Sequence, residues 1–501
     1  MIKKTIIEDK RIFIVLFIYA FLLLFFCSMM SPLYPTNNWS DINLYFNMGK
    51  AMFNSRTLYT EAFDHKGPLI FFIYGIGYLI SNASFLGMYI IESICWGLML
   101  SMAYLTARLY VDKIYAFVIA LAYSLFALSH SGEGGSAEEF ILIFEVIGLF
   151  FFLRYFKNKE TAIHDPKVML MHGILCAVVF FIKFNLIIFW FFPLLAIFIN
   201  LIRSKEYRNL LHNILAFTIG FLIITLPLCI YFLANNALSE AWNVYIELNR
   251  SYAKLGSIME IAENLIVRFY LRLRFETLEF IIILVGAIWF PYKYIANKLN
   301  AISITLSFLS LYIVIFMATG YVHYYAIPYA VFAIPGLIVI SKYIRLNNSR
   351  TVYITALVIF LIFGINKKSF FGRQINDVVK REAPKTYVDE FESIITKEKN
   401  PTLMNLGLDL GNSIFTRLNI VPNVKYFIAP NLKYEIYPEM RNAQTRVIEN
   451  KEVQFIILCS NSPQFKYFHN LPTMNQNYTI VSEIYDDIDA HAFFYLYKRN
   501  D

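Results

Sequence analysis

The sequence has few charged residues and few cysteines for its length. Only 16% of its 501 residues are charged, whereas soluble domains carry about 25%. The five cysteines show no CxxC spacing and no HExxH motif occurs, so we predict neither a disulfide scaffold nor a metal site. Hydrophobic residues reach 58%, which excludes a soluble globular enzyme and a disordered chain, and predicts a membrane protein.

Long apolar runs predict about eleven transmembrane helices, each of roughly 20 mostly apolar residues. The run 168–200 is too long for one crossing, and Lys and Arg flank it on both sides. The positive-inside rule therefore predicts two short helices that meet near Lys183. The other predicted spans are 12–30, 84–107, 114–130, 139–156, 212–234, 277–292, 299–319, 324–341 and 351–366.

The net charge of +8 follows the predicted topology. Lys and Arg are concentrated in the short connections between spans on one side, which places those connections in the cytoplasm. We therefore expect a multi-pass protein of the cell membrane with a cytoplasmic N-terminus, and no binding of nucleic acid. The predicted outer loops are 31–83, 131–138 and 235–276.

The composition changes after about residue 367, where charged and apolar residues mix. Short strand-like runs and amphipathic helical stretches predict a small α/β domain outside the membrane. We therefore expect two domains, 1–366 and 367–501. The stretch from Gly407 to Gly411 falls short of a dinucleotide fingerprint, so no cofactor is predicted there. The predicted strands are 402–408, 424–428, 453–459, 478–484 and 493–497, and the predicted helices are 384–396 and 437–450.

The first outer loop holds two groups of polar residues. Ser40 is predicted to cap a helix that lies on the membrane surface with one apolar face. Asp41 then falls in the first turn, where it would complement the helix dipole or serve as a base. In the second group, Lys66 follows Asp64 and His65; it would bind a phosphate as a point charge or extend toward water.

Further candidates lie in the other outer connections. The glycine-rich loop 131–138 and the helix start after it hold Glu133, Glu138 and Glu139, more acids than helix capping requires. Lys183 lies near membrane depth, where an ionisable residue is a functional candidate by default. With this topology, all these groups lie on the outer side. Carboxylates and lysines together can take a proton from a hydroxyl and hold a phosphate leaving group.

The order of these motifs over residues 10–340 resembles the GT-C glycosyltransferases. The branch is that of the protein O-mannosyltransferases and the aminoarabinose transferases that modify lipid A. Ile42 follows Asp41 where the mannosyltransferases have an Asp-Glu pair, and Gly67 replaces a common proline. The resemblance is carried by Ser40-Asp41-x-x-x-Tyr45, Asp64-His65-Lys66-Gly67-Pro68, Ser136-Ala-Glu138-Glu139-Phe140, Lys183 and His323-Tyr324-Tyr325.

The resemblance implies a polyprenyl- or dolichyl-phosphate sugar donor and an inverting transfer. Asp41 matches the base, and Glu138 or the neighbouring Glu139 matches a second acid. Lys66 and Lys183 match lysines that contact the donor phosphate. Since the sequence shows no His/Cys ligand cluster, we expect a metal-independent enzyme without a cofactor. Further donor-phosphate candidates are His65, His323 and Tyr324, and other site candidates are Asp64, Glu133, Tyr45 and Arg250.

The sequence is compatible with three functions. The first is a glycosyltransferase that moves a sugar from a polyprenyl phosphate to a glycopolymer, lipid or protein at the cell surface. The second is a transporter or flippase of a lipid-linked saccharide, although the paired repeats typical of transporters are not found. The third is a polysaccharide polymerase or ligase, which arginine-rich outer loops would favour. The relevant arginines are Arg250, Arg268, Arg272 and Arg274.

Overall fold

The computed structural model describes residues 8–34, 37, 39–158, 162–252, 256–318, 320–368, 386–429, 432–486 and 491–500. The chain forms two compact units. Unit 1 comprises Met1–Ser31, Tyr89–Ile230 and Ala253–Phe370, and unit 2 comprises Pro32–Met88, Tyr231–Tyr252 and Phe371–Asp501. The predicted fold class, a helical membrane bundle with a small α/β region near the C-terminus, is confirmed.

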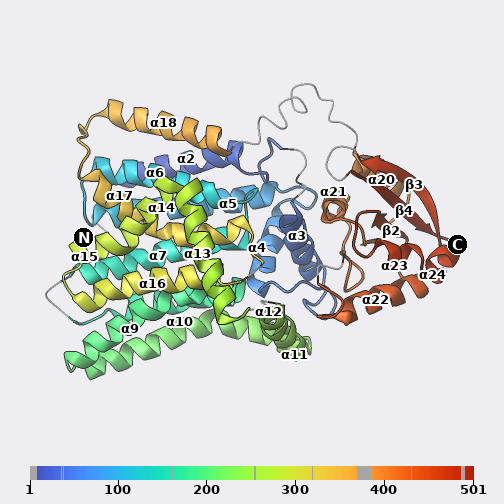
Figure 1. Cartoon of the computed structure of the whole chain (residues 1–501), viewed down its shortest axis with the longest axis horizontal. Helices are drawn as coiled ribbons and strands as arrows, with labels where there is room; N and C mark the ends of the chain where they lie inside the picture. Colours follow the sequence, from blue (N-terminus) through green and yellow to red (C-terminus); the bar gives the residue numbers. More distant parts are fainter. Residues whose placement is uncertain are drawn as a thin grey trace. The chain divides into compact units, whose positions relative to one another are not determined.

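Unit 1 is a bundle of long apolar helices, most of which run in similar directions (Figure 1). Within the described residues, nine helical segments are long and apolar enough to cross a membrane. About eleven spans were predicted; the two others correspond to α7, which carries three glutamates, and α8, which has 17 residues, and neither meets this criterion. The elements are α2 (Lys10–Cys27), α5 (Leu86–Arg108), α6 (Lys113–His130), α7 (Ala137–Lys157), α8 (Pro166–Ile182), η1 (Phe184–Ile187), α9 (Ile188–Arg203), α10 (Tyr207–Ala234), α13 (Ile258–Phe275), α14 (Thr277–Leu284), η3 (Val285–Trp289), α15 (Phe290–Tyr294), α16 (Lys298–Phe316), η4 (His323–Phe332), α17 (Ala333–Ser341) and α18 (Arg350–Lys368).

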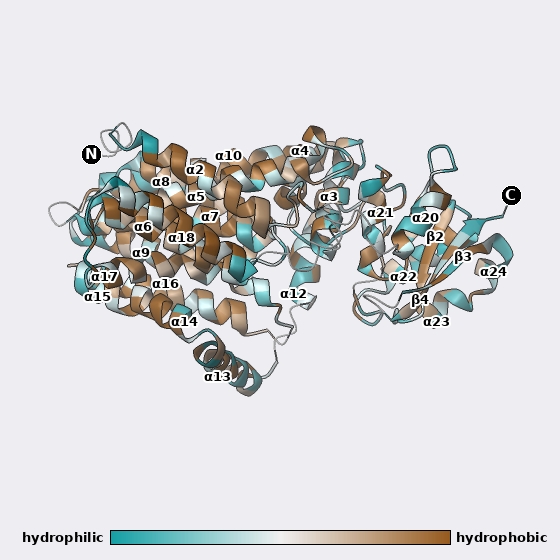
Figure 2. Cartoon of the chain, turned by 90° about the horizontal axis from the view of Figure 1, so that it is seen from above, coloured by the Kyte–Doolittle hydropathy of each residue, from teal (hydrophilic) through white to brown (hydrophobic). Residues whose placement is uncertain are grey.

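The surface of this bundle is apolar as well as its interior (Figure 2). Helix α10 leaves Ile219, Leu226 and Ile230 about half exposed or more, at 52%, 51% and 63%. Water would solvate such a surface at a large free-energy cost, whereas lipid chains would not. The exposed apolar helices therefore agree with a multi-span membrane protein.

The predicted helix break at Lys183 is confirmed. Helix α8 ends at Ile182, and Lys183 is extended, with φ −154° and ψ 97°. The 3-10 turn η1 follows, and α9 then begins at Ile188. The break frees the Lys183 side chain from the helix surface, so that it can reach a polar partner.

Unit 2 is built around two helices of the segment 31–83, the predicted first outer loop, and these helices cross at glycines. A Cβ on Gly49 of α3 would lie 2.4 Å from the backbone nitrogen of Gly75 on α4, so only hydrogen fits at this crossing. The other helices come from the third outer loop and from the C-terminal region. The elements are α3 (Ser40–Phe53), α4 (Pro68–Ile80), α11 (Leu238–Trp242), η2 (Asn243–Leu248), α12 (Asn249–Tyr252), α20 (Tyr387–Ile395), η5 (Asp409–Gly411), α21 (Asn412–Arg417), α22 (Pro438–Glu449), α23 (Phe465–His469) and α24 (Pro472–Asn477).

Two predictions for α3 are wrong. The helix begins at Ser40 itself, after Trp39, and no side chain caps it. The helix is also buried from Ile42 to Ala51 on every face, instead of showing one exposed polar face. The reason is a contact distant in sequence: α21 covers the polar face, where Asn47 donates to Asn412 O at 3.1 Å and Lys50 donates to Phe415 O at 2.5 Å.

The C-terminal sheet has the strand order β1-β2-β4-β3. Strands β1 and β2 are parallel, and the other pairs are antiparallel. The predicted strand 424–428 does not form. Instead, two isolated backbone hydrogen bonds reach the segment, from Asn405 N to Phe427 O at 2.8 Å and from Phe63 N to Lys425 O at 3.1 Å, and the Gln444 side chain donates to two more of its carbonyls. The strands are β1 (Leu403–Asn405), β2 (Phe455–Cys459), β3 (Tyr478–Asp486) and β4 (Ala492–Arg499).

Candidate functional site

Asp41 lies in the first turn of α3 in unit 2, half-buried and beside Tyr45. The Tyr45 hydroxyl donates to Asp41 Oδ2 at 3.2 Å. The Tyr45 ring is fully buried and packs edge-on against Tyr74 of α4, with the ring centroids 5.5 Å apart. The crossing of α3 and α4 therefore fixes the tyrosine that orients the Asp41 carboxylate.

The second motif of the first loop lies in the same unit, just before α4. Asp64 is 1% exposed, and its Oδ1 lies 3.3 Å from His65 Nδ1. Burial raises the pKa of Asp64 to about 6; the Lys66 cation opposes this shift, and the negative charge of Asp41 adds to it. Asp41, Asp64 and Lys66 thus interact electrostatically within unit 2. Lys66 is half-buried, and its carbonyl accepts a 2.7 Å hydrogen bond from Tyr59.

A third acid of unit 2 comes from the C-terminal region and was missed in the sequence. Asp409 hydrogen-bonds Ser40 and lies within electrostatic range of Asp41 and Asp64. Asn405 shapes its loop, because its Oδ1 accepts from Gly407 N at 3.1 Å and its Nδ2 donates to Leu408 O at 2.9 Å. The glycine-rich stretch that contains Asp409 was visible in the sequence, but its fold next to α3 was not.

In unit 1, Glu138 and Lys183 form a close ion pair. Lys183 Nζ lies 2.5 Å from Glu138 Oε1 and 3.8 Å from the centroid of the Tyr325 ring. The Glu138 side chain is 2% exposed, and its Oε2 has no hydrogen-bond partner among the described residues. The pair joins the start of α7 to the break between α8 and α9, and it leaves one carboxylate oxygen unused.

The neighbouring Glu139 uses both of its carboxylate oxygens in hydrogen bonds that hold the fold. Its Oε1 accepts from Trp96 Nε1 at 2.5 Å, and its Oε2 accepts from the backbone of Gly135 at 2.9 Å. Gly135 and Gly134 both have positive φ values, 75° and 99°, which side chains rarely adopt. Glu139 therefore holds the turn of the second outer loop, whereas Glu138 faces a lysine.

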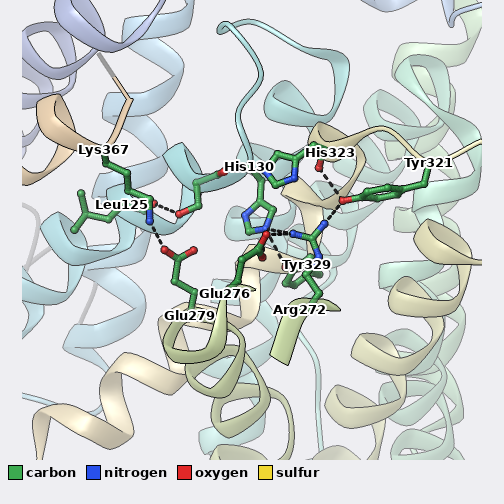
Figure 3. Close-up of polar contacts among 10 residues, drawn as sticks. Leu125, His130, Arg272, Glu276, Glu279, Tyr321, His323, Tyr329 and Lys367 are labelled. Atoms are coloured by element: carbon green, nitrogen blue, oxygen red, sulfur yellow. Dashed lines mark hydrogen bonds and ion pairs between the residues drawn. The ribbon is translucent and has the colours of Figure 1, made fainter. Parts of the chain in front are cut away.

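Unit 1 also holds a buried charge network that the sequence did not reveal (Figure 3). Three groups converge on His130 Nε2: Glu276 Oε2 at 2.9 Å, Arg272 Nη1 at 3.0 Å and the Tyr329 hydroxyl at 3.0 Å. Arg272 also donates to Glu276 Oε1 and to the Tyr321 hydroxyl. The i, i+4 spacing of Arg272 and Glu276 is the only part of this network that the sequence shows.

The Glu276 carboxylate is strongly held by this network. Burial raises the pKa of Glu276, but hydrogen bonds from His130 and Arg272 outweigh burial and lower it to about 2. The network connects α6, the end of α13, the residue before α14 and η4, so it fastens α13 to the rest of the bundle. Its members come from positions up to 199 residues apart.

His130, Glu276 and His323 offer ligand atoms within 4.8 Å of one another, so they are a candidate metal group. The two imidazole rings, however, are stacked with an interplanar angle of 15° and centroids 5.1 Å apart. A bound ion lies near the plane of each ligating ring, at about 2.0–2.1 Å from nitrogen for zinc, which stacked rings cannot both satisfy. Arg272 also occupies the space beside His130 Nε2. The three residues therefore fit a charge network and do not fit a coordination shell.

The remaining candidates have separate surroundings. His323 Nε2 lies 3.1 Å from the carbonyl of Ser129, while Tyr324 is buried and packs edge-on against Tyr325. The Glu133 carbonyl accepts from Met29 N at 2.8 Å. Arg250 is exposed on the short helix α12 in unit 2. The predicted site residues divide between the two units. Unit 2 contains Asp41, Tyr45, Asp64, His65, Lys66 and Arg250, and unit 1 contains Glu133, Glu138, Glu139, Lys183, His323 and Tyr324.

Comparison with known proteins identifies the fold. The family model "Dolichyl-phosphate-mannose-protein mannosyltransferase" matches residues 59–241. No curated protein sequence matches the chain significantly. Among solved structures, ArnT from Cupriavidus metallidurans bound to undecaprenyl phosphate has a TM-score of 0.61 at 12% identity, covering 98% of both chains. The oligosaccharyltransferase AglB from Archaeoglobus fulgidus, in complex with an inhibitory peptide and a dolichol-phosphate, has a TM-score of 0.50 at 14% identity, covering 97% of this chain and 74% of that one.

The protein family that the model describes and both structural neighbours are glycosyltransferases. The resemblance expected from the motifs is thus supported by two independent comparisons, one of sequence and one of structure. The chain has the GT-C fold, in the form seen in ArnT.

Proposed function

We propose that the protein is an inverting glycosyltransferase, which moves a sugar from a polyprenyl-phosphate donor to an acceptor at the outer face of the cell membrane. The observation that carries this proposal is the arrangement in unit 2. There, Asp41 is oriented by Tyr45 and lies in electrostatic contact with the Asp64–Lys66 motif. A carboxylate and a lysine that both interact electrostatically with Asp64 supply the two functions that such a transfer needs, a base and a cation for the leaving phosphate.

In the proposed reaction, Asp41 takes the proton of an acceptor hydroxyl. The hydroxyl oxygen attacks the anomeric carbon from the side opposite the phosphate, and the bond between that carbon and the phosphate oxygen breaks. The phosphate leaves with the bonding electrons, and Lys66 stabilises its charge. The products are an inverted glycoside and a polyprenyl phosphate, and the proton remains on Asp41 until water removes it.

Glu138 and Lys183 are proposed as the second acid and the second phosphate-binding lysine. Their 2.5 Å contact supports this choice of Glu138 over Glu139, whose two oxygens are taken by Trp96 and Gly135. The undecaprenyl phosphate bound to ArnT and the dolichol-phosphate bound to AglB support a lipid-phosphate donor. His65, His323 and Tyr324 remain further candidates for the phosphate, and the C-terminal region is proposed to lie outside the cytoplasm.

The proposal is tested with full-length protein in lipid nanodiscs and a panel of undecaprenyl-phosphate sugars. Release of undecaprenyl phosphate is measured in the presence of an envelope extract that supplies acceptors. We expect Asp41→Asn to lower the rate by about 10²–10⁴, the range for loss of a general base. Glu263→Gln, at an exposed acid of α13, is the control and should keep the wild-type rate. Near-normal turnover in Asp41→Asn would refute the assignment of the base.

Metal independence is part of the proposal. It is supported by the stacked imidazoles, which do not suit shared coordination. Treatment with EDTA should leave the rate of undecaprenyl phosphate release unchanged, and elemental analysis of the purified protein should find less than one metal ion per chain. A rate that falls with EDTA and returns with one divalent cation would overturn this part.

A polysaccharide polymerase or ligase is the second candidate. The specific observation in its favour is the set of arginines on α12 and α13, of which Arg250 and Arg274 are exposed and Arg268 is half-buried. Such cations suit a diphosphate-linked donor better than a monophosphate. The same nanodisc assay with undecaprenyl-diphosphate glycans discriminates between the two, because only a polymerase or ligase would release the diphosphate.

A further inference from the structure

Unit 2 contains a polar groove that no step of the proposed reaction uses. It has a volume of about 320 Å³, within the usual range for ligand sites. One wall is the first-loop segment with Arg56, Thr60 and Glu61, and the other walls are the segment 423–426 and the helix α22 with the residues after it. The groove is therefore a joint product of the first outer loop and the C-terminal region.

Three residues that line this groove carry buried polar atoms without hydrogen-bond partners in the described part of the chain. These atoms are Gln444 Oε1, Asn423 Oδ1 and Arg56 Nε. Gln444 is fully buried at 0% exposure, and its amide nitrogen is already used by the carbonyls of Tyr426 and Ile428. Unpaired buried polar groups cost about 1–3 kcal/mol each. A ligand rich in hydroxyl groups, which both donate and accept, would relieve that cost after small side-chain rotations.

The chemistry of the walls discriminates between classes of ligand. Arg56, Lys425 and Arg446 face Glu61 and Glu452, so the charges nearly balance and a strongly anionic ligand is not favoured. The ion pair of Arg446 with Glu439 is more than half exposed, at 55% and 53%, and exposed pairs are worth little. Hydroxyl groups can therefore replace such contacts at small cost. Val424, Ala443 and Val447 also line the groove, but a lipid chain placed beside them would bury the charged and amide groups of the other walls without hydrogen bonds.

A peptide is also disfavoured by the backbone of this segment. An extended peptide usually binds by adding a strand to free backbone groups. Here the carbonyl of Asn423 accepts from Arg56 at 2.8 Å, that of Lys425 accepts from Phe63 N at 3.1 Å, and that of Tyr426 accepts from Gln444 at 3.0 Å. Recognition must therefore come from the side chains, as is typical for a carbohydrate.

The groove also lies close to the residues proposed for catalysis in unit 2. Glu61 precedes Asp64 by three residues, which limits their separation to about 11 Å even if the chain were fully extended. We propose that this groove binds the sugar units of a carbohydrate acceptor next to the hydroxyl that Asp41 deprotonates. This inference rests on the proposed transferase function and narrows it, because it selects a glycan over a lipid or a protein as the acceptor.

The experiment uses Ala443→Phe, which places a ring in the groove and removes no side-chain hydrogen bond. Full-length protein in nanodiscs receives an undecaprenyl-phosphate sugar that the wild type cleaves, with or without the glycan fraction of the cell envelope. We expect the variant to lose acceptor-dependent release about tenfold, or roughly 1.4 kcal/mol, through a higher KM for the glycan. Hydrolysis of the donor without acceptor should stay at the wild-type rate. Asn450→Ala, at an exposed lining residue, should weaken the glycan response in the same direction.

Glu449→Phe is the matched control, because it adds the same ring to α22 at an exposed position that does not line the groove. Binding of the fluorescent glycan fraction to the nanodiscs is measured in parallel and does not depend on turnover. If the wild type cleaves no donor but binds the glycan through the groove, the proposed transferase function is wrong and the glycan-binding role of the groove is supported. If Ala443→Phe keeps full binding and full acceptor-dependent release, the groove proposal is wrong. Preference of the wild type for a protein or lipid extract would overturn the carbohydrate assignment.

Discussion

Two acids of unit 1 and three acids of unit 2 lie in different electrostatic settings. Glu138 and Glu276 in unit 1 each contact a cation, Lys183 in one case and Arg272 in the other. In unit 2, Asp64 is buried near Asp41 and Asp409, and all three carry the same charge when ionised. Glu138 and Glu276 therefore depend on their cations, whereas burial and the charge of Asp41 work against ionisation of Asp64. Like charges gathered in this way reduce folding stability, a cost that proteins tolerate where the residues serve a reaction.

The largest effect that would test this comparison is expected from Lys183→Met. It would leave the buried Glu138 carboxylate unpaired, which costs about 3–5 kcal/mol for a pair of this kind. The thermal midpoint of the protein in nanodiscs should therefore fall sharply. In the double variant Glu138→Gln with Lys183→Met, most of the loss should return. If the single variant melted like the wild type, unit 1 would not depend on its charge pairs.

An effect of intermediate size and opposite sign is expected at Asp64, where substitution should raise the stability of the fold at neutral pH. Its pKa is raised to about 6 in the folded state, against an ordinary value near 4, so folding takes up a proton between these values. The stability that protonated Asp64 contributes is present below about pH 4 and is lost as the pH rises through 6. The linked free energy is on the order of 2–3 kcal/mol.

The variant Asp64→Asn removes this pH dependence. Its thermal midpoint should match that of the wild type near pH 4 and exceed it at pH 7.5. Melting curves of both proteins across this range measure the difference, and Asp165→Asn, at a helix cap of unit 1, serves as a pH control. Equal pH profiles for Asp64→Asn and the wild type would show that folding does not raise the pKa of Asp64.

The smallest effect is expected from Tyr45→Phe. The variant loses the 3.2 Å hydrogen bond to Asp41 but keeps the ring that packs against Tyr74. A typical hydrogen bond contributes about 0.5–1.5 kcal/mol, so turnover should fall about twofold to tenfold while the melting temperature changes little. A loss as large as that of Asp41→Asn would mean that the tyrosine itself takes part in proton transfer.

Local patterns in the sequence were sufficient for most of the helices. Apolar run lengths and flanking charges predicted the bundle, and the excessive length of the run 168–200 between basic flanks predicted the break near Lys183. The short motifs around Asp41, Lys66 and Glu138 predicted where polar side chains gather. Each of these signals lies within a few residues of the feature that it predicts.

Contacts between distant segments could not be predicted in this way. The all-round burial of α3 depends on α21, which lies more than 360 residues later in the chain. The network of His130, Arg272 and Tyr329 likewise joins three separate helices. The segment 424–428 has the composition of a strand, but its carbonyls accept hydrogen bonds from Phe63 N and from the Gln444 side chain. A local pattern contains no information about such partners.

The crossing of α3 and α4 at Gly49 and Gly75 has a mechanical consequence. Because backbone touches backbone there, the two helices can pivot about the contact but cannot approach further. Asp41 lies eight residues from Gly49, about 12 Å along the helix, so a pivot of roughly 5° displaces it by about 1 Å. A displacement of about 1 Å can change a catalytic rate by a factor of roughly 10². Small tilts of α4 about this crossing would therefore change the position of the base far more than they would change the stability of the fold.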